Sequence, residues 1–420
     1  MAAKNRIELI RKLEKARKSA VLTLVTGDRF STVAFRGIQG SIASDQVHII
    51  TSHLKALADN GSLKQLDLVI YSRGGDTNTA WPLVNIIRNH ADTFCVLIPL
   101  HAHSAATLTS LGADKIVMSR TGELSPIDPT VANLFNPRDE QTNQPLGISV
   151  EDVTSFIALA RDPERVNISG EDNITRVFQS LSTKVHPLAL GNVKRAHTQI
   201  RELARKLLSL HMGDGQDRKI LDGIVDELTE RLYTHEHLIF RDEARKSIGL
   251  TNVIDASEDE EDILWQLYKD YEQELKLKEF FDPLVFLGES DQRELDTTTV
   301  VIESSQQTSA FRWKQKLCRA LPPDPGFRLQ VGSQLAQQAL AKIQCELQVQ
   351  AQLGNLRAQI VQAAAQPGQE DLQRQLQETY NRISELNPRE PSIDLDKLRV
   401  HIESQVISMG WEHKEYRELL

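Results

Sequence analysis

The chain has 420 residues, of which 40% are hydrophobic and 25% are charged, and its formal net charge is -9. This length and composition are typical of a globular protein with two or three domains. The negative charge gives no general attraction for nucleic-acid phosphates, and no basic groove with interleaved aromatic residues is apparent, so a nucleic-acid partner is not expected.

Cysteine usage and the absence of apolar segments indicate the compartment. Cys95, Cys318 and Cys345 stand far apart without CxxC spacing, so neither a disulfide framework nor a zinc site is predicted, and no metal or other cofactor is expected. Residues 1–18 lack the uncharged apolar stretch of a signal peptide, and no later segment has the about 20 apolar residues of a membrane span. We expect a cytoplasmic protein, with contact between the basic segment 1–18 and a membrane surface as an alternative.

The first 120 residues alternate strand patterns with helical patterns. Strands are expected at 21–25, 32–35, 66–71, 94–100 and 115–118, and helices at 42–60, 77–90 and 104–111. Continuous apolar runs fit strands that are covered on both faces. The alternation predicts parallel strands joined by helical crossovers, and therefore an α/β fold.

The rest of the chain is more helical. A polar excursion at 132–147 is interpreted as a surface loop or as a lid over the site. Helices are expected at 150–160, 174–185, 193–211 and 263–277, and strands at 284–287 and 298–302. Two Gln- and Ala-rich segments with apolar stripes predict an antiparallel helical hairpin over 332–386.

These patterns predict three segments. Residues 1–290 form the α/β domain, 291–331 form a linker with short strands, and 332–420 form a helical segment for oligomerisation or partner binding.

Two strand-turn-helix junctions carry the residue types of acyl transfer. Gly74 and Gly75 follow the strand that ends at Tyr71, and glycine backbone turns freely toward a bound oxygen. Ser104 follows the next strand at the expected start of a helix, where unpaired amides favour negative charge. Acyl transfer requires at least a nucleophile and a neighbouring site that stabilises the oxyanion. The structural alternative is that Ser104 is only a helix cap.

A serine hydroxyl needs a base, and two residues downstream are candidates for its partners. Asp128 stands between an isoleucine and a proline, and His186 precedes Pro187, which disfavours helical backbone at the histidine. Serine, aspartate and histidine in this order is one of the known orders of a catalytic triad. Asp128 as a turn former and His186 as a structural histidine remain alternatives.

Four motifs together resemble the serine dehydrogenase proteinase family, which belongs to the Clp-peptidase and signal-peptide-peptidase group of the crotonase-like superfamily. They are 68–75, Ser104-Ala-Ala-Thr-Leu, 112–118 and 124–129. The resemblance extends over about 7–250. It implies a crotonase/Clp-type spiral of strand-helix units, to which residues beyond about 290 add a C-terminal helical extension.

The resemblance implies a serine peptidase with a triad and a backbone oxyanion site. The triad residues are Ser104, Asp128 and His186; the oxyanion amides are those of Gly75 and Ala105, with Gly74 shaping the turn. In this mechanism the histidine takes the serine proton, the aspartate orients the imidazole, and the amides stabilise the tetrahedral oxyanion.

The chain departs from the wider group at two positions beside the expected site. His103 precedes the serine where a small or apolar residue is usual, with His101 two residues before it, and Arg73 precedes the glycines. Arg73 would pair with a substrate carboxylate or face solvent. Alternative bases are His103 itself and, as in a Ser-Lys dyad, Lys184 or Lys194.

The expected function is therefore peptide-bond hydrolysis, with a peptide or protein substrate and a homo-oligomeric assembly. One alternative is a crotonase-like acyl-coenzyme A hydrolase or hydratase that uses the same amide pair on a thioester. Ser104 at a helix start disfavours the hydratase, which needs acidic residues and no serine nucleophile. A second alternative is a degenerate protease fold whose helical hairpin binds a partner.

Overall fold

The computed structural model describes most of the first 320 residues and parts of the remainder. The described residues are 2–30, 37–58, 61–128, 130–131, 133–138, 146–212, 218–231, 237–320, 355, 359–360, 374–379 and 401–415. The chain divides into two compact units. The first comprises Met1–Phe286, Glu294–Lys316 and Val406–Leu420, and the second comprises Leu287–Arg293 and Leu317–Gln405. The candidate active site belongs to the first unit.

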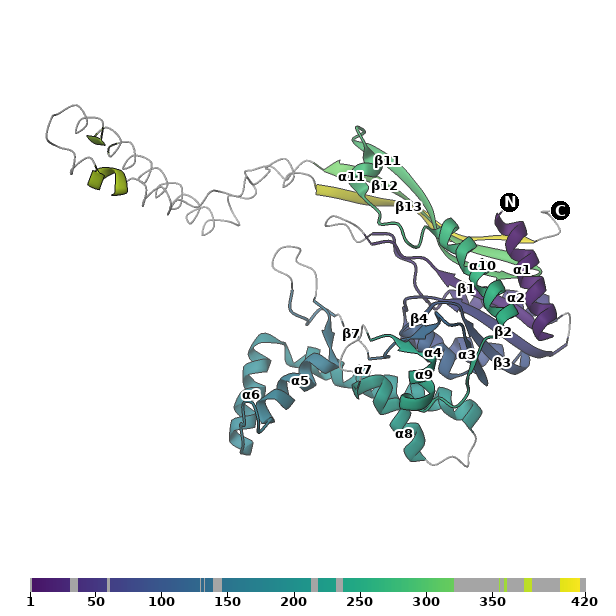
Figure 1. Cartoon of the computed structure of the whole chain (residues 1–420), viewed down its shortest axis with the longest axis horizontal. Coiled ribbons are helices and arrows are strands. Elements are labelled where there is room, and N and C mark those ends of the chain that lie inside the picture. The colour runs from purple at the N-terminus through teal and green to yellow at the C-terminus, as the bar shows by residue number, and fades with distance from the viewer. Residues whose placement is uncertain are drawn as a thin grey trace. The chain divides into compact units, whose positions relative to one another are not determined.

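A large sheet has the strand order β10-β5-β3-β2-β1-β11-β12-β13 (Figure 1). Its parallel strands are β1 (Ala20–Thr26), β2 (Leu63–Tyr71), β3 (Ala91–Ile98), β5 (Lys115–Met118) and β10 (Val253–Asp255). The remaining strands are β11 (Gln292–Ser304), β12 (Gln307–Ala320) and β13 (His401–Glu415), and β11 runs antiparallel to β1. The α/β class predicted from the sequence is confirmed.

Helices cover both faces of this sheet. They include α1 (Ala2–Arg17), α2 (Gln46–Ala58), α3 (Ala80–Arg88), α4 (Ala105–Leu111), α7 (Pro187–Met212), α8 (Arg218–Asp226) and α10 (Glu258–Leu275). Helices α2, α3, α4 and α7 pack in one hydrophobic core, and α1 and α10 pack in the other. Because side chains alternate along a strand, Leu68 and Ile70 of β2 enter the first core, and Val69 and Tyr71 enter the second.

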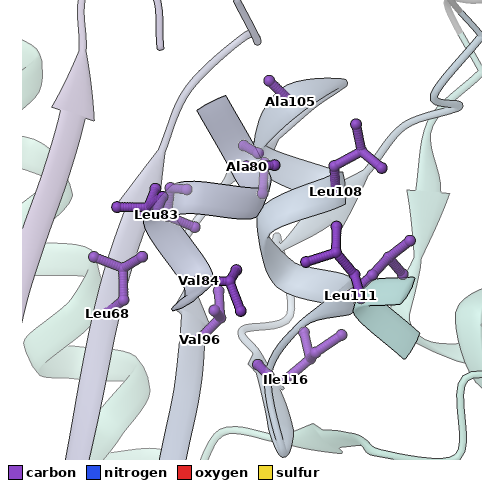
Figure 2. Close-up of a cluster of buried hydrophobic side chains, with 14 of the residues drawn as sticks. Leu68, Ala80, Leu83, Val84, Val96, Ala105, Leu108, Leu111 and Ile116 are labelled. Carbon is purple, nitrogen blue, oxygen red and sulfur yellow. The ribbon is translucent and has the colours of Figure 1, made fainter. Parts of the chain in front are cut away.

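The first core fixes the helix that follows Ser104. Figure 2 shows Leu108 and Leu111 of α4 beside Val84 of α3 and close to the strand residues Val96 and Ile116. All seven residues of α4 are buried. The helix therefore has one defined position against the sheet, and so does the turn before it.

Further elements lie outside the large sheet and the helices named above. A small sheet has the order β4-β6-β9, formed by β4 (His101–Ala102), β6 (Glu123–Leu124) and β9 (Ile239–Phe240). The others are η1 (Thr77–Thr79), β7 (Thr130–Val131), β8 (Ile148–Ser149), α5 (Val150–Arg161), α6 (Glu171–Lys184), η2 (Glu227–Arg231), α9 (Arg241–Glu243), η3 (Ala244–Ile248) and α11 (Pro283–Leu287).

Three predictions for the C-terminal part are wrong. The expected strand at 284–287 is the helix α11, because the Asp282 carboxylate accepts hydrogen bonds from the amides of Leu284 and Val285 at 2.8 and 3.1 Å. Residues 291–331 were expected to be a linker with short strands, whereas β11 and β12 have 13 and 14 residues. Part of the segment expected to be helical, 332–420, is the strand β13.

The remaining predictions are only partly covered by the described residues. The expected strand at 298–302 lies within β11. The expected strand at 32–35 lies outside the described residues. So does most of the expected hairpin over 332–386, although the described residues 374–379 within it are helical. The domain boundaries at 290 and 331 stay predictions. No helix among the described residues has both the length and the apolar composition needed to cross a bilayer.

A buried histidine makes the stability of the first unit depend on pH. His53 of α2 is fully buried, with Nδ1 3.1 Å from Ser304 Oγ and Nε2 2.9 Å from Ser309 Oγ. Burial, assisted by the nearby His413, lowers the pKa of His53 from 6.5 to about 3. The folded state therefore holds this ring neutral at pH values where the unfolded chain protonates it.

We predict that this histidine destabilises the protein as the pH falls below 6.5. Because the unfolded state binds the extra proton, the free energy of unfolding should decrease by roughly 2 kcal/mol between pH 6.5 and pH 5 through His53 alone. Urea unfolding of His53→Gln at several pH values should lack this component, whereas His48→Gln, an exposed position on the same helix, should keep it. Equal pH slopes for the wild-type protein and His53→Gln would contradict the assignment.

Candidate active site

Ser104 stands at a strained turn between β4 and α4. Its backbone angles are φ 50° and ψ -109°, a conformation that residues other than glycine rarely adopt. The Ser104 amide donates a hydrogen bond to Ser125 Oγ at 2.8 Å, and the preceding amide, of His103, donates to Ser72 O at 3.0 Å. The Ser104 side chain makes no capping hydrogen bond to the helix. The hydroxyl is therefore presented by the turn rather than used as a cap.

The diglycine bend after β2 packs directly against Ser104. Gly74 and Gly75 have φ values of 120° and 149°, which favour glycine. A Cβ on Gly74 would lie 2.9 Å from Ser104 Cβ and 3.4 Å from Ser104 Oγ. A Cβ on Gly75 would lie 2.2 Å from Ile42 O, so neither position has room for a side chain.

Two backbone amides near Ser104 have no backbone acceptor within the described part of the chain. Ile42 pairs with the bend through the Gly74 carbonyl and the Asp76 amide, at 2.9 and 2.8 Å, which leaves the Gly75 amide without a backbone acceptor among the described residues. Ala105 is the first residue of α4, so its amide has no intrahelical acceptor. The parallel strands β2 and β3 end at the same edge of the sheet, which brings the segments after them together.

Asp128 lies in the loop that supports the Ser104 turn. It is 5% exposed, and the loop is held by the Ile127 amide, which donates to Leu228 O at 3.0 Å. Three residues earlier in this loop, Ser125 accepts the Ser104 amide. Asp128 therefore belongs to the same segment that fixes the serine backbone.

His186 lies at the start of α7, and its ring is exposed. Its Nδ1 accepts a hydrogen bond from the Leu188 amide at 3.2 Å, and its ring stacks on Phe135 with a centroid separation of 5.0 Å. Among the described residues these are the hydrogen-bond and ring-stacking partners of the imidazole, and Ser104 is not one of them. The two lysines named as alternative bases are also exposed, Lys184 at the end of α6 and Lys194 on α7.

Arg73, beside the glycines, is already paired. Its guanidinium lies 3.5 Å from Asp28 and 4.9 Å from the centroid of the Phe30 ring. The arginine is about one third exposed, so this pairing leaves part of it in contact with solvent.

Sequence reasoning missed Glu123, which contacts both histidines before Ser104. Glu123 Oε1 is hydrogen-bonded to His101 Nδ1 and to His103 Nε2, the latter at 3.1 Å. Burial acts to raise the pKa of Glu123, but the hydrogen bonds from the two histidines outweigh it and lower this pKa to about 2. The spacing of the two histidines was visible in the sequence, but the contact with a residue about 20 positions later depends on the pairing of β4 with β6.

We predict that Gly74→Ala destabilises the fold by displacing the Ser104 turn. The added Cβ would collide with Ser104 Cβ, and φ of 120° is unfavourable for alanine, so the free energy of unfolding should decrease by roughly 1 to 3 kcal/mol. Gly61→Ala is the matched control, because its Cβ would have no neighbour closer than 3.7 Å. Urea unfolding measures both variants. If Gly74→Ala is as stable as Gly61→Ala, the close approach is not present in solution.

The N-terminal third of the chain matches a known family model. Residues 1–144 match the model of the ClpP-like SDH-type serine proteinase, which ends well before the residue 250 expected from the motifs. Two relatives come from Methanocaldococcus jannaschii. The uncharacterized protein MJ0137 is 26% identical over 268 residues, covering 63% of this chain and 78% of its own length. The uncharacterized protein MJ1495 is 26% identical over 129 residues, covering 30% and 42%.

Solved structures that align with part of this chain include two mutants of the 1510-N membrane-bound stomatin-specific protease. A serine-to-alanine mutant aligns at 15% identity over 55% of this chain and 79% of that chain, with a TM-score of 0.29. A lysine-to-alanine mutant in complex with a substrate peptide aligns at 13% identity over 54% and 94%, with a TM-score of 0.21. Residues 1–144 are thus similar to the ClpP-like SDH-type serine proteinase family, in agreement with the resemblance predicted from the motifs.

Proposed function

We propose that this protein is a serine peptidase in which Ser104 Oγ attacks the carbonyl carbon of a peptide bond. The observation that carries the proposal is the strained backbone of Ser104, which is held against Gly74 and presents a hydroxyl that caps no helix. Proteins keep such strain where the surrounding structure fixes it, and such sites are often functional. The family match over 1–144 supports the same reaction class.

In the proposed mechanism the amides of Gly75 and Ala105 stabilise the oxyanion. Attack by Ser104 Oγ forms a bond to the carbonyl carbon and places negative charge on the carbonyl oxygen. Both amides lack an acceptor among the backbone groups described above, so they are available to this oxygen. The amine then leaves with a proton, and water hydrolyses the acyl-enzyme.

We further propose that His186 is the base and that Asp128 orients it. The histidine would take the proton of the serine hydroxyl and pass it to the leaving amine. Because the His186 ring stacks on Phe135 in this structure, this role requires the ring to leave Phe135 and approach Ser104 when substrate binds. Catalytic hydrogen bonds commonly form only in the substrate complex. His103, Lys184 and Lys194 are the competing bases.

The remaining parts of the proposal are a peptide or protein substrate, a homo-oligomer and a cytoplasmic location. Free thiols at Cys95 and Cys318 are compatible with a reducing compartment. Phe156 on α5 and Phe178 on α6 are exposed, and large apolar side chains that are exposed to solvent support contacts with a second copy.

We predict that a fluorophosphonate probe labels the wild-type protein and does not label Ser104→Ala. Ser110→Ala is a matched control. It also removes one hydroxyl from this region, but Ser110 is buried and donates its hydroxyl to Ala106 O, so labelling should persist. The measurement is in-gel fluorescence after labelling at equal protein concentration. Equal labelling of Ser104→Ala and the wild-type protein would rule out Ser104 as the nucleophile.

The base is tested by hydrolysis of a peptide substrate. His186→Ala should lower kcat by roughly 10² to 10⁴, which is the usual contribution of general acid–base catalysis, and Asp128→Asn should lower it as well. Lys184→Ala and Lys194→Ala should leave kcat within about twofold of the wild-type value. Full activity of His186→Ala would show that another group is the base, and a loss confined to one lysine variant would identify it.

A further inference from the structure

His101, His103 and Glu123 lie close together beside the proposed nucleophile, Ser104. The strands β4 and β6 are parallel neighbours, and their register pairs His101 with Glu123 directly. His101 lies in β4 and His103 directly follows this strand, and both imidazole rings reach Glu123 Oε1. On the other flank the amide of Ser72 donates to His101 O at 2.9 Å. Backbone hydrogen bonds on both sides of β4 therefore fix the backbone of the residues that carry these side chains.

The polar atoms of these three side chains meet at one point. His101 Nδ1 and His103 Nε2 both approach the same oxygen of Glu123, and all three potential ligand atoms lie within 4.8 Å of one another. In a tetrahedral zinc site with bonds of about 2.0 to 2.2 Å, ligand atoms are separated by roughly 3.3 to 3.5 Å. The separation of 3.1 Å between His103 Nε2 and Glu123 Oε1 is already close to this value.

The burial of the cluster suits a bound ion with access from solvent. The Glu123 side chain is 6% exposed, whereas those of His101 and His103 are 23% and 18% exposed. The carboxylate thus lies at the inner end of the cluster and the rings lie nearer the surface. The Tyr71 ring packs against His101 with centroids 5.3 Å apart, which restricts the orientation of that imidazole.

We propose that His101, His103 and Glu123 form a binding site for a divalent transition-metal ion, with zinc as its preferred occupant. Imidazole nitrogen and carboxylate oxygen are usual zinc ligands, whereas magnesium and calcium prefer sites built from oxygen alone. Three protein ligands leave one position of a tetrahedral ion for water. This site was not expected from the cysteine pattern. One of its ligands, His103, directly precedes Ser104 in the chain.

The proposal does not depend on peptidase activity, so its test measures metal binding directly. The full chain, without a polyhistidine tag, is first dialysed against a chelator. It is then titrated with zinc chloride at pH 7 in an isothermal titration calorimeter, and the bound metal is counted by mass spectrometry. We expect a saturable site at one zinc per chain and no comparable binding of magnesium.

Variants identify the ligands. Glu123→Gln and His101→Asn should each weaken zinc binding by more than about 100-fold, because even residues that only support a ligand change metal affinity by 10- to 100-fold. His48→Asn, an exposed histidine on α2, should bind zinc as the wild-type protein does. Circular dichroism confirms that each variant is folded.

Two further measurements make the result decisive. Cobalt(II) should give visible absorption bands of a tetrahedral ion with the wild-type protein and not with Glu123→Gln. Ser104→Ala should bind zinc normally, so failure of the peptidase proposal and failure of the metal site are separate results. The proposal is overturned if the wild-type protein binds no zinc, or if folded Glu123→Gln and His101→Asn bind it with unchanged affinity.

Discussion

The close packing of Gly74 on Ser104 is the constraint on which the candidate site depends. Both residues have backbone conformations that most residues avoid, and each is held by groups from other segments. Ser104 donates its amide to Ser125, and the bend at Gly74 pairs with Ile42. A larger residue at Gly74 would remove the space in which the serine turn lies. The proposed nucleophile and the proposed oxyanion amides are therefore parts of one packed arrangement.

The sheet and its two cores explain why this arrangement is stable. Alternate residues of β2 enter opposite cores, so a shift by one residue would move every side chain into the opposite core and disrupt the packing on both faces. The neighbouring strand β3 runs parallel to it, and the turns that follow the two strands meet at one edge. Buried α4 then fixes the residue that follows Ser104. Strain at the serine is supported by this large buried core.

Local patterns in the sequence predicted those parts of the site that lie within one strand-to-helix connection. The strand-helix units, the diglycine bend and the serine at a helix start follow from apolar periodicity and from the backbone freedom of glycine. The non-helical backbone predicted at His186 is also found, since α6 ends at Lys184 and α7 begins at Pro187. No local pattern gives the position of that helix start in space, however, so the sequence did not reveal that the ring stacks on Phe135.

The features that the sequence did not predict depend on pairing between distant segments. Glu123 meets two histidines only because two very short strands are paired in parallel. The helix α11 depends on a cap from Asp282, since an apolar run of four residues fits a strand as well as a helix. The strand β13 has apolar residues at the alternate positions Ile407, Met409 and Trp411, which is typical of a strand, but its pairing at the edge of the sheet is not visible in the sequence.

A crystal structure of the full chain after inactivation by a fluorophosphonate tests the central claim most directly. The account predicts a covalent bond from Ser104 Oγ to phosphorus, with the phosphoryl oxygen about 2.7 to 3.1 Å from the amide nitrogens of Gly75 and Ala105. An adduct on another residue, or a phosphoryl oxygen turned away from both amides, would contradict it.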